Sequence, residues 1–436
     1  MQENNLTNLT GKVNVFRAFP HALQHILAMF ATNLVPILTI ASITGQTMSD
    51  ELTLALSQNA MLIAGIATLI QSTPIWKIGS GLPIVMGMSF TFLITLVTIA
   101  LTYGYPGVIG AVIIGGLFEG LLGLTARYWK RIISPIVSAT VVTCIGLSLL
   151  GTATRSFGGG YADDFGAIHY LVIGFATIAA CIIWQIYAKG TKKQLSILMG
   201  LTVGYIASLF FGIIVFPDFS GVKIFSLPKI LPVMPEFHFD AILSICVIYL
   251  VSATETIGDV SAISGGGLHR IATSEEISGA LTVDGFGSML GGLFGVPPVT
   301  SYSENVGLTI MTGVTNRNVF RIAAGTLIFC AFFPPIGYFF RTIPAPVIGG
   351  VLLVVFGQIL VSGFQMMSDA GFTTRNKLIA SLSLAIGIGF TEAAQGGIWS
   401  KMPPIIQSIF SQNIVAMVFV ISLFLSLVLP RKMDEK

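Results

Sequence analysis

The chain has 436 residues, of which 54% are hydrophobic and only 9% are charged. A mean hydropathy of +0.87 excludes an ordinary soluble globular protein, and a net charge of +3 gives no reason to expect a nucleic-acid partner. The composition therefore predicts an all-α polytopic membrane protein with the lipid bilayer around it.

Apolar runs of about 20 residues, each long enough to cross a bilayer, recur along the chain. The sequence predicts fourteen such segments, at 20–42, 52–72, 82–100, 105–125, 133–151, 167–187, 195–216, 239–262, 277–296, 299–313, 319–338, 344–364, 377–393 and 411–429. The residues ahead of the first segment are polar and do not form a cleavable signal peptide, so this segment is expected to direct insertion.

The third and tenth segments, 82–100 and 299–313, are poorly shaped as helices. Gly and Pro interrupt the chain at 79–83 and at 295–298, and each segment then alternates small or hydroxyl residues with larger ones. This pattern is more typical of a short strand than of a helix. The alternative is the ordinary tolerance of membrane helices for Gly and Pro.

A polar connection at 217–238 divides the chain into two halves. Residues 1–216 hold segments 1–7, and residues 239–436 hold segments 8–14. An odd number of crossings in each half forces the halves to lie inverted relative to each other. Interrupted segments at matching positions of two inverted repeats predict a binding site near the bilayer midplane.

Lysine and arginine determine the expected orientation. With fourteen crossings and both termini in the cytoplasm, 17 of the 22 basic side chains fall on the cytoplasmic side, as the positive-inside rule requires. We therefore expect a multi-pass protein of the cell (inner) membrane with both termini cytoplasmic.

Acidic residues inside predicted segments are unusual, because a charge at the bilayer centre costs about 2.5–3.5 kcal/mol on insertion scales. Six occur here: Glu119, Glu255, Asp259, Asp284, Glu304 and Glu392. Such acids mark binding sites or ion pathways by default. For Glu119, which lies about two turns from Arg127, we instead expect a snorkelling or helix-linking role.

Glu255 and Asp259 are four residues apart and share one face of a helix. Two like charges in a dry site cannot both ionise cheaply, so at least one of these carboxyls is expected to take up a proton readily. Carboxylates also accept hydrogen bonds from N–H groups, which purine and pyrimidine bases present beside C=O groups. A structural pair that joins helices is the alternative.

The four cysteines lie in apolar segments without a CxxC pair, and the five histidines form no cluster with them. We therefore expect no metal site and no cofactor. No spacing of a nucleophile and a base indicates an enzyme.

The motif Glu304-Asn305-x-Gly307, completed by Thr312-Gly313, resembles the signature of the nucleobase–ascorbate transporter family. Further residues fall in the family's order within a match over about residues 15–430: Gln24, His25, Glu255, Asp259 and Asp284. Among the members of this family, the chain is similar to the xanthine and uric acid permeases.

This resemblance implies both a site and an architecture. The implied substrate-binding residues are Glu255, Glu304, Asn305, Phe90, Tyr302 and Asp259, and those implied to support the site or the coupling are His25, Gln24 and Asp284. The resemblance also implies short antiparallel strands in segments 3 and 10, a core domain from segments 1–4 and 8–11, a gate domain from segments 5–7 and 12–14, and a homodimer.

By the same resemblance, Glu255 and Glu304 bind the base, Asp259 supports them, and Asn305 holds the geometry of the site. Phe90 and Tyr302 match positions at which relatives offer main-chain contacts to the base.

The implied function is import of a purine base, xanthine or uric acid, by alternating access and symport with a proton or a sodium ion. Asp259 favours this reading, whereas Glu304 is common in uracil transporters, so a uracil:proton symporter is the alternative. An anion transporter of the same inverted-repeat architecture would need basic residues at the breaks, and none lies between Ser80 and Ala100 or between Ala272 and Val314. A channel is a further alternative, and it would be supported by conduction that does not saturate with substrate concentration.

Overall fold

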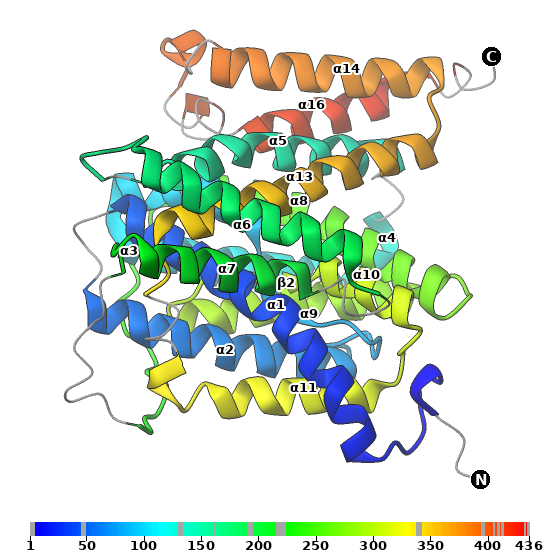
Figure 1. Ribbon diagram of the computed structural model, residues 1–436. Helices are drawn as coiled ribbons and strands as arrows, with labels where there is room; N and C mark the ends of the chain where they lie inside the picture. Colours follow the sequence, from blue (N-terminus) through cyan, green and yellow to red (C-terminus); the bar gives the residue numbers. More distant parts are fainter. Residues whose placement is uncertain are drawn as a thin grey trace.

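The structure, a computed structural model, describes residues 5–44, 49–129, 134–160, 162–189, 195–214, 224–336, 342–393, 397–403, 406–407, 410, 414–430 and 433. Helices dominate, and they pack side by side (Figure 1). Buried apolar side chains from many helices form one large hydrophobic cluster with smaller clusters beside it.

The described helices lie along nearly the whole chain. In chain order they are α1 Val15–Thr44, α2 Asp50–Ser72, α3 Leu93–Leu124, α4 Ala126–Trp129, α5 Pro135–Phe157, α6 Ile168–Tyr187, α7 Ser196–Phe210, α8 Phe239–Ala262, α9 Ser274–Leu293, α10 Ser303–Thr312, α11 Arg317–Cys330, α13 Ala345–Ala370, α14 Thr374–Ile388 and α16 Ile414–Val428. Short 3₁₀ turns occur at η1 Asn5–Thr7, η2 Phe90–Phe92 and η6 Gly397–Trp399, and π turns occur at η4 Ile263–Gly267 and η5 Gly389–Ala393.

Seven of the described helices are long and apolar enough to cross a membrane. They span Val15–Ala41, Glu51–Ser72, Phe90–Leu124, Pro135–Phe157, Ile168–Tyr187, Phe239–Gly267 and Ala345–Ala370. The expected multi-pass membrane protein is therefore confirmed. The count of fourteen crossings and the inverted relation of the two halves stay predictions.

One helix joins two predicted segments, 82–100 and 105–125. Its backbone leaves the helical conformation at Gly104, where φ is 71°, and Pro106 follows two residues later. Proline removes a backbone donor and glycine tolerates the positive φ, so this Gly-x-Pro sequence explains the kink in α3.

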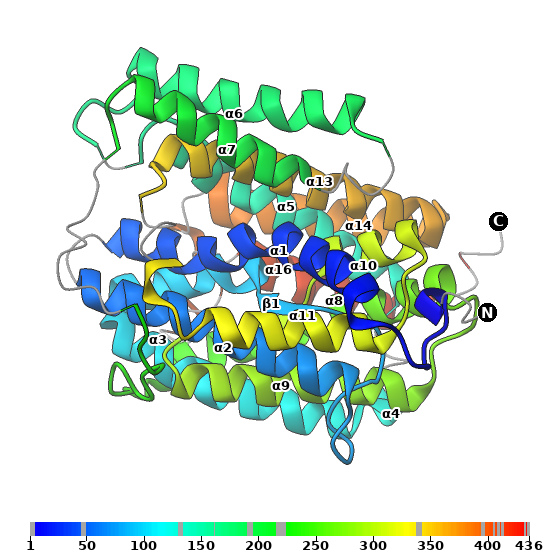
Figure 2. The ribbon, with the colours of Figure 1, turned by 60° about the horizontal axis from the view of Figure 1, so that its bottom comes forward.

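Two short strands occupy the interrupted segments, as the sequence predicts. Strand β1, Met86–Met88, pairs in antiparallel register with β2, Val299–Ser301, and both are buried. Prolines at 83, 297 and 298 prevent helix formation immediately before the strands. Figure 2 shows β1 near the centre of the molecule.

Side chains from neighbouring helices satisfy the outer backbone groups of the two strands. The Thr68 hydroxyl accepts from the Met86 N–H over 2.9 Å, and the Asn33 side-chain oxygen accepts from the Met88 N–H over 2.9 Å. The Ser288 hydroxyl accepts from the Val299 N–H, also over 2.9 Å. An isolated two-stranded ribbon would be marginal by itself, so these contacts hold it in place.

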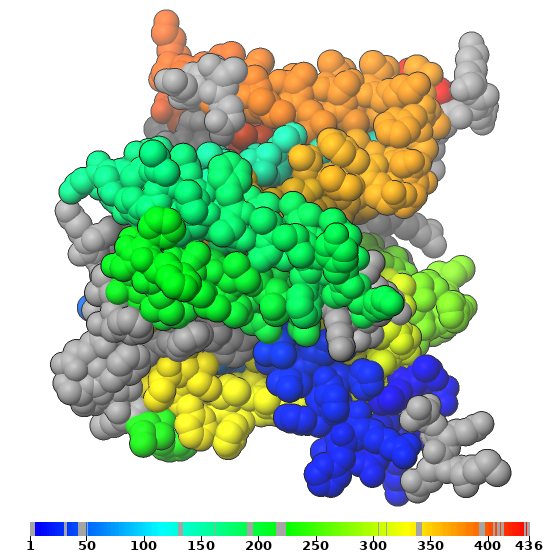
Figure 3. All heavy atoms as spheres, viewed as in Figure 1, coloured from blue at the N-terminus to red at the C-terminus, as the bar shows by residue number. Residues whose placement is uncertain are grey.

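The closest packing between helices falls within two sets. One set contains α1–α3 and α8–α11 with the two strands, and the other contains α5–α7 with α13, α14 and α16. Figure 1 shows α14 and α16 at the top and α2 and α11 at the bottom, and Figure 2 shows α6, α7 and α13 above α2 and α9. Figure 3 shows the atoms of α6 and α7 in green, covering much of one face between the orange and the blue and yellow regions.

Candidate functional site

A cavity of about 960 Å³ lies where the two sets of helices meet. On one side it is lined by residues 88–91, from the end of β1 into η2, by Glu255 and Asp259 of α8, and by residues 300–303, from β2 into the start of α10. Side chains of α5, α6, α7 and α13 line the other side. The volume is within the range of small-molecule sites.

Glu255 lies on the cavity wall, and the interrupted segment after β1 supplies its hydrogen-bond donor. Thr91, in the turn η2 that follows β1, donates its hydroxyl hydrogen to Glu255 Oε2 over 2.7 Å. Since the Thr91 side chain is buried and Glu255 is half-buried, the carboxylate is held at the wall. A carboxylate fixed in this way can accept further hydrogen bonds from a ligand's N–H groups.

Asp259 lies one turn farther along α8, on the same face, and is only 7% exposed. Its Oδ2 atom accepts hydrogen bonds from Ser301 Oγ over 2.5 Å and from Ser303 Oγ over 3.1 Å. Both serines come from the segment that contains β2 and the start of α10. Burial of a carboxylate is tolerated when such donors are present.

Two helical N-termini meet at the cavity. The turn η2 begins at Phe90, and α10 begins at Ser303 directly after Tyr302. The first N–H groups of a helix have no partner within it and carry partial positive charge. Phe90 and Tyr302, both predicted site residues, line the cavity, and so do the segments that carry these N–H groups.

The Phe90 ring also reaches the opposite wall. It lies edge-on to Phe356 of α13, with ring centroids 5.4 Å apart. This aromatic contact joins the two sets of helices across the site.

Asn305 and His25 lie behind the cavity and do not line it. The two residues are buried, and His25 Nδ1 lies 3.1 Å from Asn305 Oδ1. The His25 ring also packs against Phe320 of α11, with centroids 4.6 Å apart. The contact fastens α10 to α1, which fits a role in site geometry. Gln24, the neighbour of His25, is half-buried and is not part of the lining.

Asp284 is fully buried on α9, also behind the cavity. It accepts a hydrogen bond from the Thr256 hydroxyl of α8. Glu304 lies in the first turn of α10, but its side chain falls outside the described part of the structure, as does that of Glu392.

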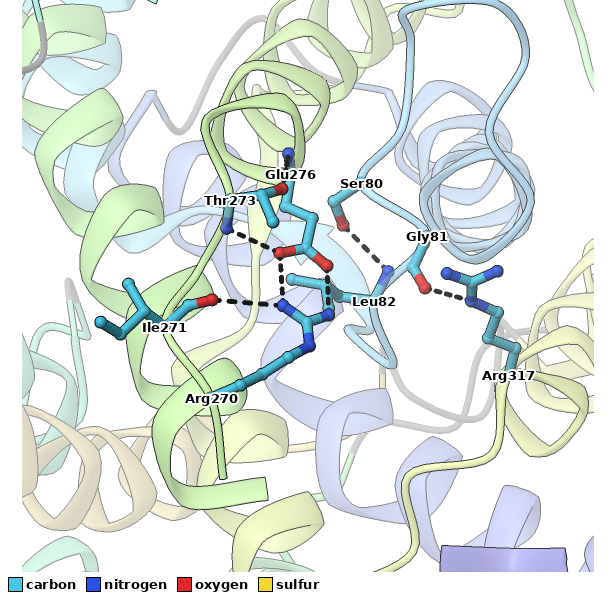
Figure 4. Close-up of polar contacts among 8 residues, drawn as sticks. All are labelled: Ser80, Gly81, Leu82, Arg270, Ile271, Thr273, Glu276 and Arg317. Atoms are coloured by element: carbon cyan, nitrogen blue, oxygen red, sulfur yellow. Dashed lines mark hydrogen bonds and ion pairs between the residues drawn. The ribbon is translucent and has the colours of Figure 1, made fainter. Parts of the chain in front are cut away.

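Figure 4 shows how the interrupted segment before β1 is anchored at its outer end. Arg317 of α11 donates to the Gly81 carbonyl oxygen, and the Leu82 N–H donates to Ser80 Oγ over 3.1 Å. Gly81 has a φ of +70°, a conformation that glycine adopts without strain. The segment is therefore anchored to α11 at its outer end.

An ion pair stabilises the nearby start of α9. Arg270 and Glu276 bind through two N–H groups, one of them over 2.8 Å, and Thr273 and Glu276 form a capping box (Figure 4). Burial alone would raise the pKa of the Glu276 carboxyl, but hydrogen bonds from Arg270 and Thr273 and the Arg270 charge bring this pKa below its usual value.

The sequence did not identify the hydroxyl partners of the two carboxylates, which are Thr91 for Glu255 and Ser301 and Ser303 for Asp259. Hydroxyl residues in the interrupted segments were visible as a pattern. Their pairing depends on the strand register and on where α8 crosses, which no local signal carries. The cavity lining contains no lysine, arginine or histidine among the described residues, and these residues include no cluster of three or more potential metal ligands.

The Permease family matches residues 16–396. The chain belongs to this family. It is 30% identical to the xanthine permease of Bacillus subtilis over 405 residues, which cover 90% of each chain. It is 31% identical to the xanthine permease XanQ of Escherichia coli K12, over 86% of this chain and 83% of that one. The uric acid permease PucJ of B. subtilis is 30% identical, over 93% and 91% of the two chains.

The expected relationship to the nucleobase–ascorbate transporters and their xanthine and uric acid permeases is thus confirmed. These relatives are named as permeases, and the match with them supports nucleobase transport. The seven long apolar helices described above agree with this family assignment.

Two solved structures share the fold of this permease at low sequence identity. The transmembrane domain of the cyanobacterial bicarbonate transporter BicA aligns with a TM-score of 0.59 at 15% identity, over 96% of this chain and all of that one. The murine anion transporter Slc26a9 in its inward-facing state aligns with a TM-score of 0.65 at 9% identity, over 97% of this chain and 69% of that one. At these identities the likeness describes the fold alone.

Proposed function

We propose that this permease imports a purine base, xanthine or uric acid, by symport with a proton across the cell membrane. The observation that carries the proposal is the pair of carboxyls, Glu255 and Asp259, which line one wall of the cavity and are held by hydroxyls from the interrupted segments. Relatives named as xanthine and uric acid permeases support the choice of substrate.

The chemistry of a purine base complements this wall. Oxidised purines present N–H groups that the Glu255 carboxylate accepts, with Asp259 one turn away in support. Their C=O groups suit the N–H groups at the starts of η2 and α10. The Phe90 ring offers a face or an edge to the planar base.

Coupling to a proton follows from the acidity of the same wall. Two carboxyls one turn apart, without a basic residue in the described lining, repel each other when both are ionised. A proton that enters with the base relieves this repulsion, so that substrate and proton favour each other's binding. A sodium ion could do the same, and the ion dependence of uptake distinguishes the two.

Alternating access would come from relative movement of the two sets of helices, because the cavity lies between them. The set with α1–α3 and α8–α11 would carry the site, and the set with α5–α7, α13, α14 and α16 would form the gate. The distribution of Lys and Arg supports cytoplasmic termini.

Anion transport is the rival function within this fold, since the two solved structures are a bicarbonate transporter and an anion transporter. An anion site would require positive charge, yet the described cavity lining is acidic. Uracil is the rival substrate, and Glu304 is the residue that favours it.

Thermal stabilisation of the purified protein by a panel of xanthine, urate, guanine, hypoxanthine, uracil and ascorbate tests the proposal. A ligand that binds only the folded state raises the melting temperature, and the gain in stability grows with the logarithm of the ligand concentration over Kd. Stabilisation by xanthine or urate alone is expected. Stabilisation by uracil alone would assign the chain to uracil, and no stabilisation by any base would refute the proposed function.

A further inference from the structure

Glu119 is a fully buried carboxyl that no family motif in the sequence includes. It lies on α3, and both its oxygens lack a hydrogen-bond partner among the described residues. It therefore does not snorkel, which is one of the two roles expected from the sequence, and Arg127 bonds to Tyr128 instead. A buried charge without partners is very costly, and a group in this position normally stays neutral by holding a proton.

Asp284 lies next to Glu119, because α3 and α9 pack in close contact. A Cβ placed on Gly285 would lie 1.9 Å from the Gly120 nitrogen and 2.6 Å from the Glu119 carbonyl carbon. The backbones therefore touch next to both acids, and Glu119 and Asp284 interact electrostatically. Asp284 is also fully buried, and its Oδ1 atom has no partner among the described residues.

Hydroxyl groups lead from Asp284 to the cavity. Thr256 donates to Asp284 Oδ2, and Thr256 Oγ1 lies 3.4 Å from Ser301 Oγ. Ser301 then donates to Asp259 Oδ2, on the cavity wall, over 2.5 Å. All the hydroxyls in this path are buried.

Other ionisable groups on the neighbouring helices do not neutralise the two acids. The ionisable side chains of α8 that lie in this electrostatic environment lose a proton when they ionise and so add no positive charge: Cys246, Tyr249, Glu255 and Asp259. The charged or basic groups on the other packed elements lie at the surface or have partners elsewhere: Arg17 is exposed, His21 is half-buried at the start of α1, His25 bonds to Asn305, Glu51 pairs with Lys229, and Arg127 stacks on Tyr128.

We propose that Glu119 and Asp284 form a buried acid pair that holds one proton behind the cavity and exchanges it with Asp259 through Thr256 and Ser301. The direction of exchange would depend on whether a base occupies the cavity. The role of this exchange in transport rests on the proposed proton symport. The shared proton itself does not depend on which substrate is transported.

The proton balance of the exchange is simple. The Thr256 hydroxyl first turns its hydrogen from Asp284 toward Ser301, and it then accepts a proton from the acid pair as it passes its own proton to Ser301. Ser301 passes its own proton to the Asp259 carboxylate. One acid becomes a carboxylate, one carboxylate becomes an acid, and the hydroxyls are unchanged.

Infrared spectroscopy of the full-length protein in lipid, in H₂O and D₂O, tests the pair. The wild type at neutral pH should show a deuterium-sensitive carboxylic-acid C=O band that weakens or shifts in Glu119→Gln, where only Asp284 remains to hold the proton. The control variant Glu275→Gln, on the exposed start of α9, should keep the band. A spectrum of Glu119→Gln in which the band is unchanged would overturn the inference.

Two further measurements separate this inference from the proposed function and from a folding defect. Xanthine should perturb the band in the wild type but not in Thr256→Val, and an equal response in both proteins refutes the relay. If xanthine does not bind the wild type, the proposed function fails. The comparison of wild type and Glu119→Gln without ligand still tests whether the two acids share a proton. If Glu119→Gln inserts poorly, Glu119→Asp replaces it in the test, because it keeps a carboxyl group at this position. The C=O band should then shift in Glu119→Asp. An unshifted band would count against the pair.

Discussion

The Thr91 hydroxyl and the Glu255 carboxylate lie 2.7 Å apart, although 164 residues separate them in the chain. One belongs to the interrupted segment after β1 and the other to the continuous helix α8. The site is thus assembled where irregular backbone meets a regular helix. Such backbone is tolerated at membrane depth only inside protein or beside a cavity.

The first prediction concerns the Glu255 carboxylate. Glu255→Gln keeps the size of the side chain but replaces charge-assisted hydrogen bonds to the base by neutral ones. Each charge-assisted bond contributes about 1.5–3 kcal/mol to the free energy of binding. Xanthine should therefore bind roughly 10- to 100-fold more weakly, as measured by calorimetry. Glu275→Gln serves as the control and should bind as the wild type does. An unchanged affinity in Glu255→Gln would remove this carboxylate from the site.

The second prediction concerns the donor that positions this carboxylate. Thr91→Val removes the hydroxyl while keeping the shape, and the lost hydrogen bond, about 1 kcal/mol, should weaken xanthine binding about fivefold. Thr91→Ser retains the hydroxyl and should restore most of the affinity. If Ser and Val behave alike in calorimetry, the contact does not contribute.

The sequence predicted several features of the site from local signals. Gly and Pro marked both interrupted segments, and the four-residue spacing of Glu255 and Asp259 placed both on the cavity wall. These features depend on backbone preferences and on helical periodicity, which a single sequence carries.

Other features depend on contacts between distant elements and could not be predicted. Asn305 belongs to the family motif, and His25 and Asp284 fall in the family's order, yet all three lie behind the cavity wall. Glu119 gave no sign of full burial, because its surroundings are set by how closely α3 and α9 approach. That distance depends on glycines from both helices together.

The third prediction tests this close approach. Gly285→Ala places a methyl group against the Gly120 backbone, and overpacking of this kind typically costs about 1–3 kcal/mol. The melting temperature of the purified protein should fall clearly. Gly287→Ala, two residues along the same helix, would place its methyl 3.6 Å from the Ala67 side chain. This control should melt near the wild type, and equal melting of both variants would contradict the contact.

The fourth prediction concerns pH and the Arg270–Glu276 pair. Because the pKa of Glu276 is lowered in the folded protein, its contribution to stability is present above the ordinary glutamate range, about pH 4–5, and is lost as the pH falls through the lowered value. Glu276→Gln keeps a residue that can form the capping box. The wild type should melt at a higher temperature than this variant at pH 7, and the difference should vanish in acid. A difference that persists unchanged at low pH would show that charge is not its cause.

The measurement that tests the central proposal most directly is uptake of labelled xanthine into proteoliposomes under an inward proton gradient. The wild type should accumulate xanthine above its external concentration only while the gradient is present, and Glu255→Gln should not accumulate it at equal protein content. Urate should compete with xanthine. Failure of the wild type to accumulate xanthine or urate under the gradient, or equal accumulation by Glu255→Gln, would contradict a proton-coupled purine site at Glu255 and Asp259.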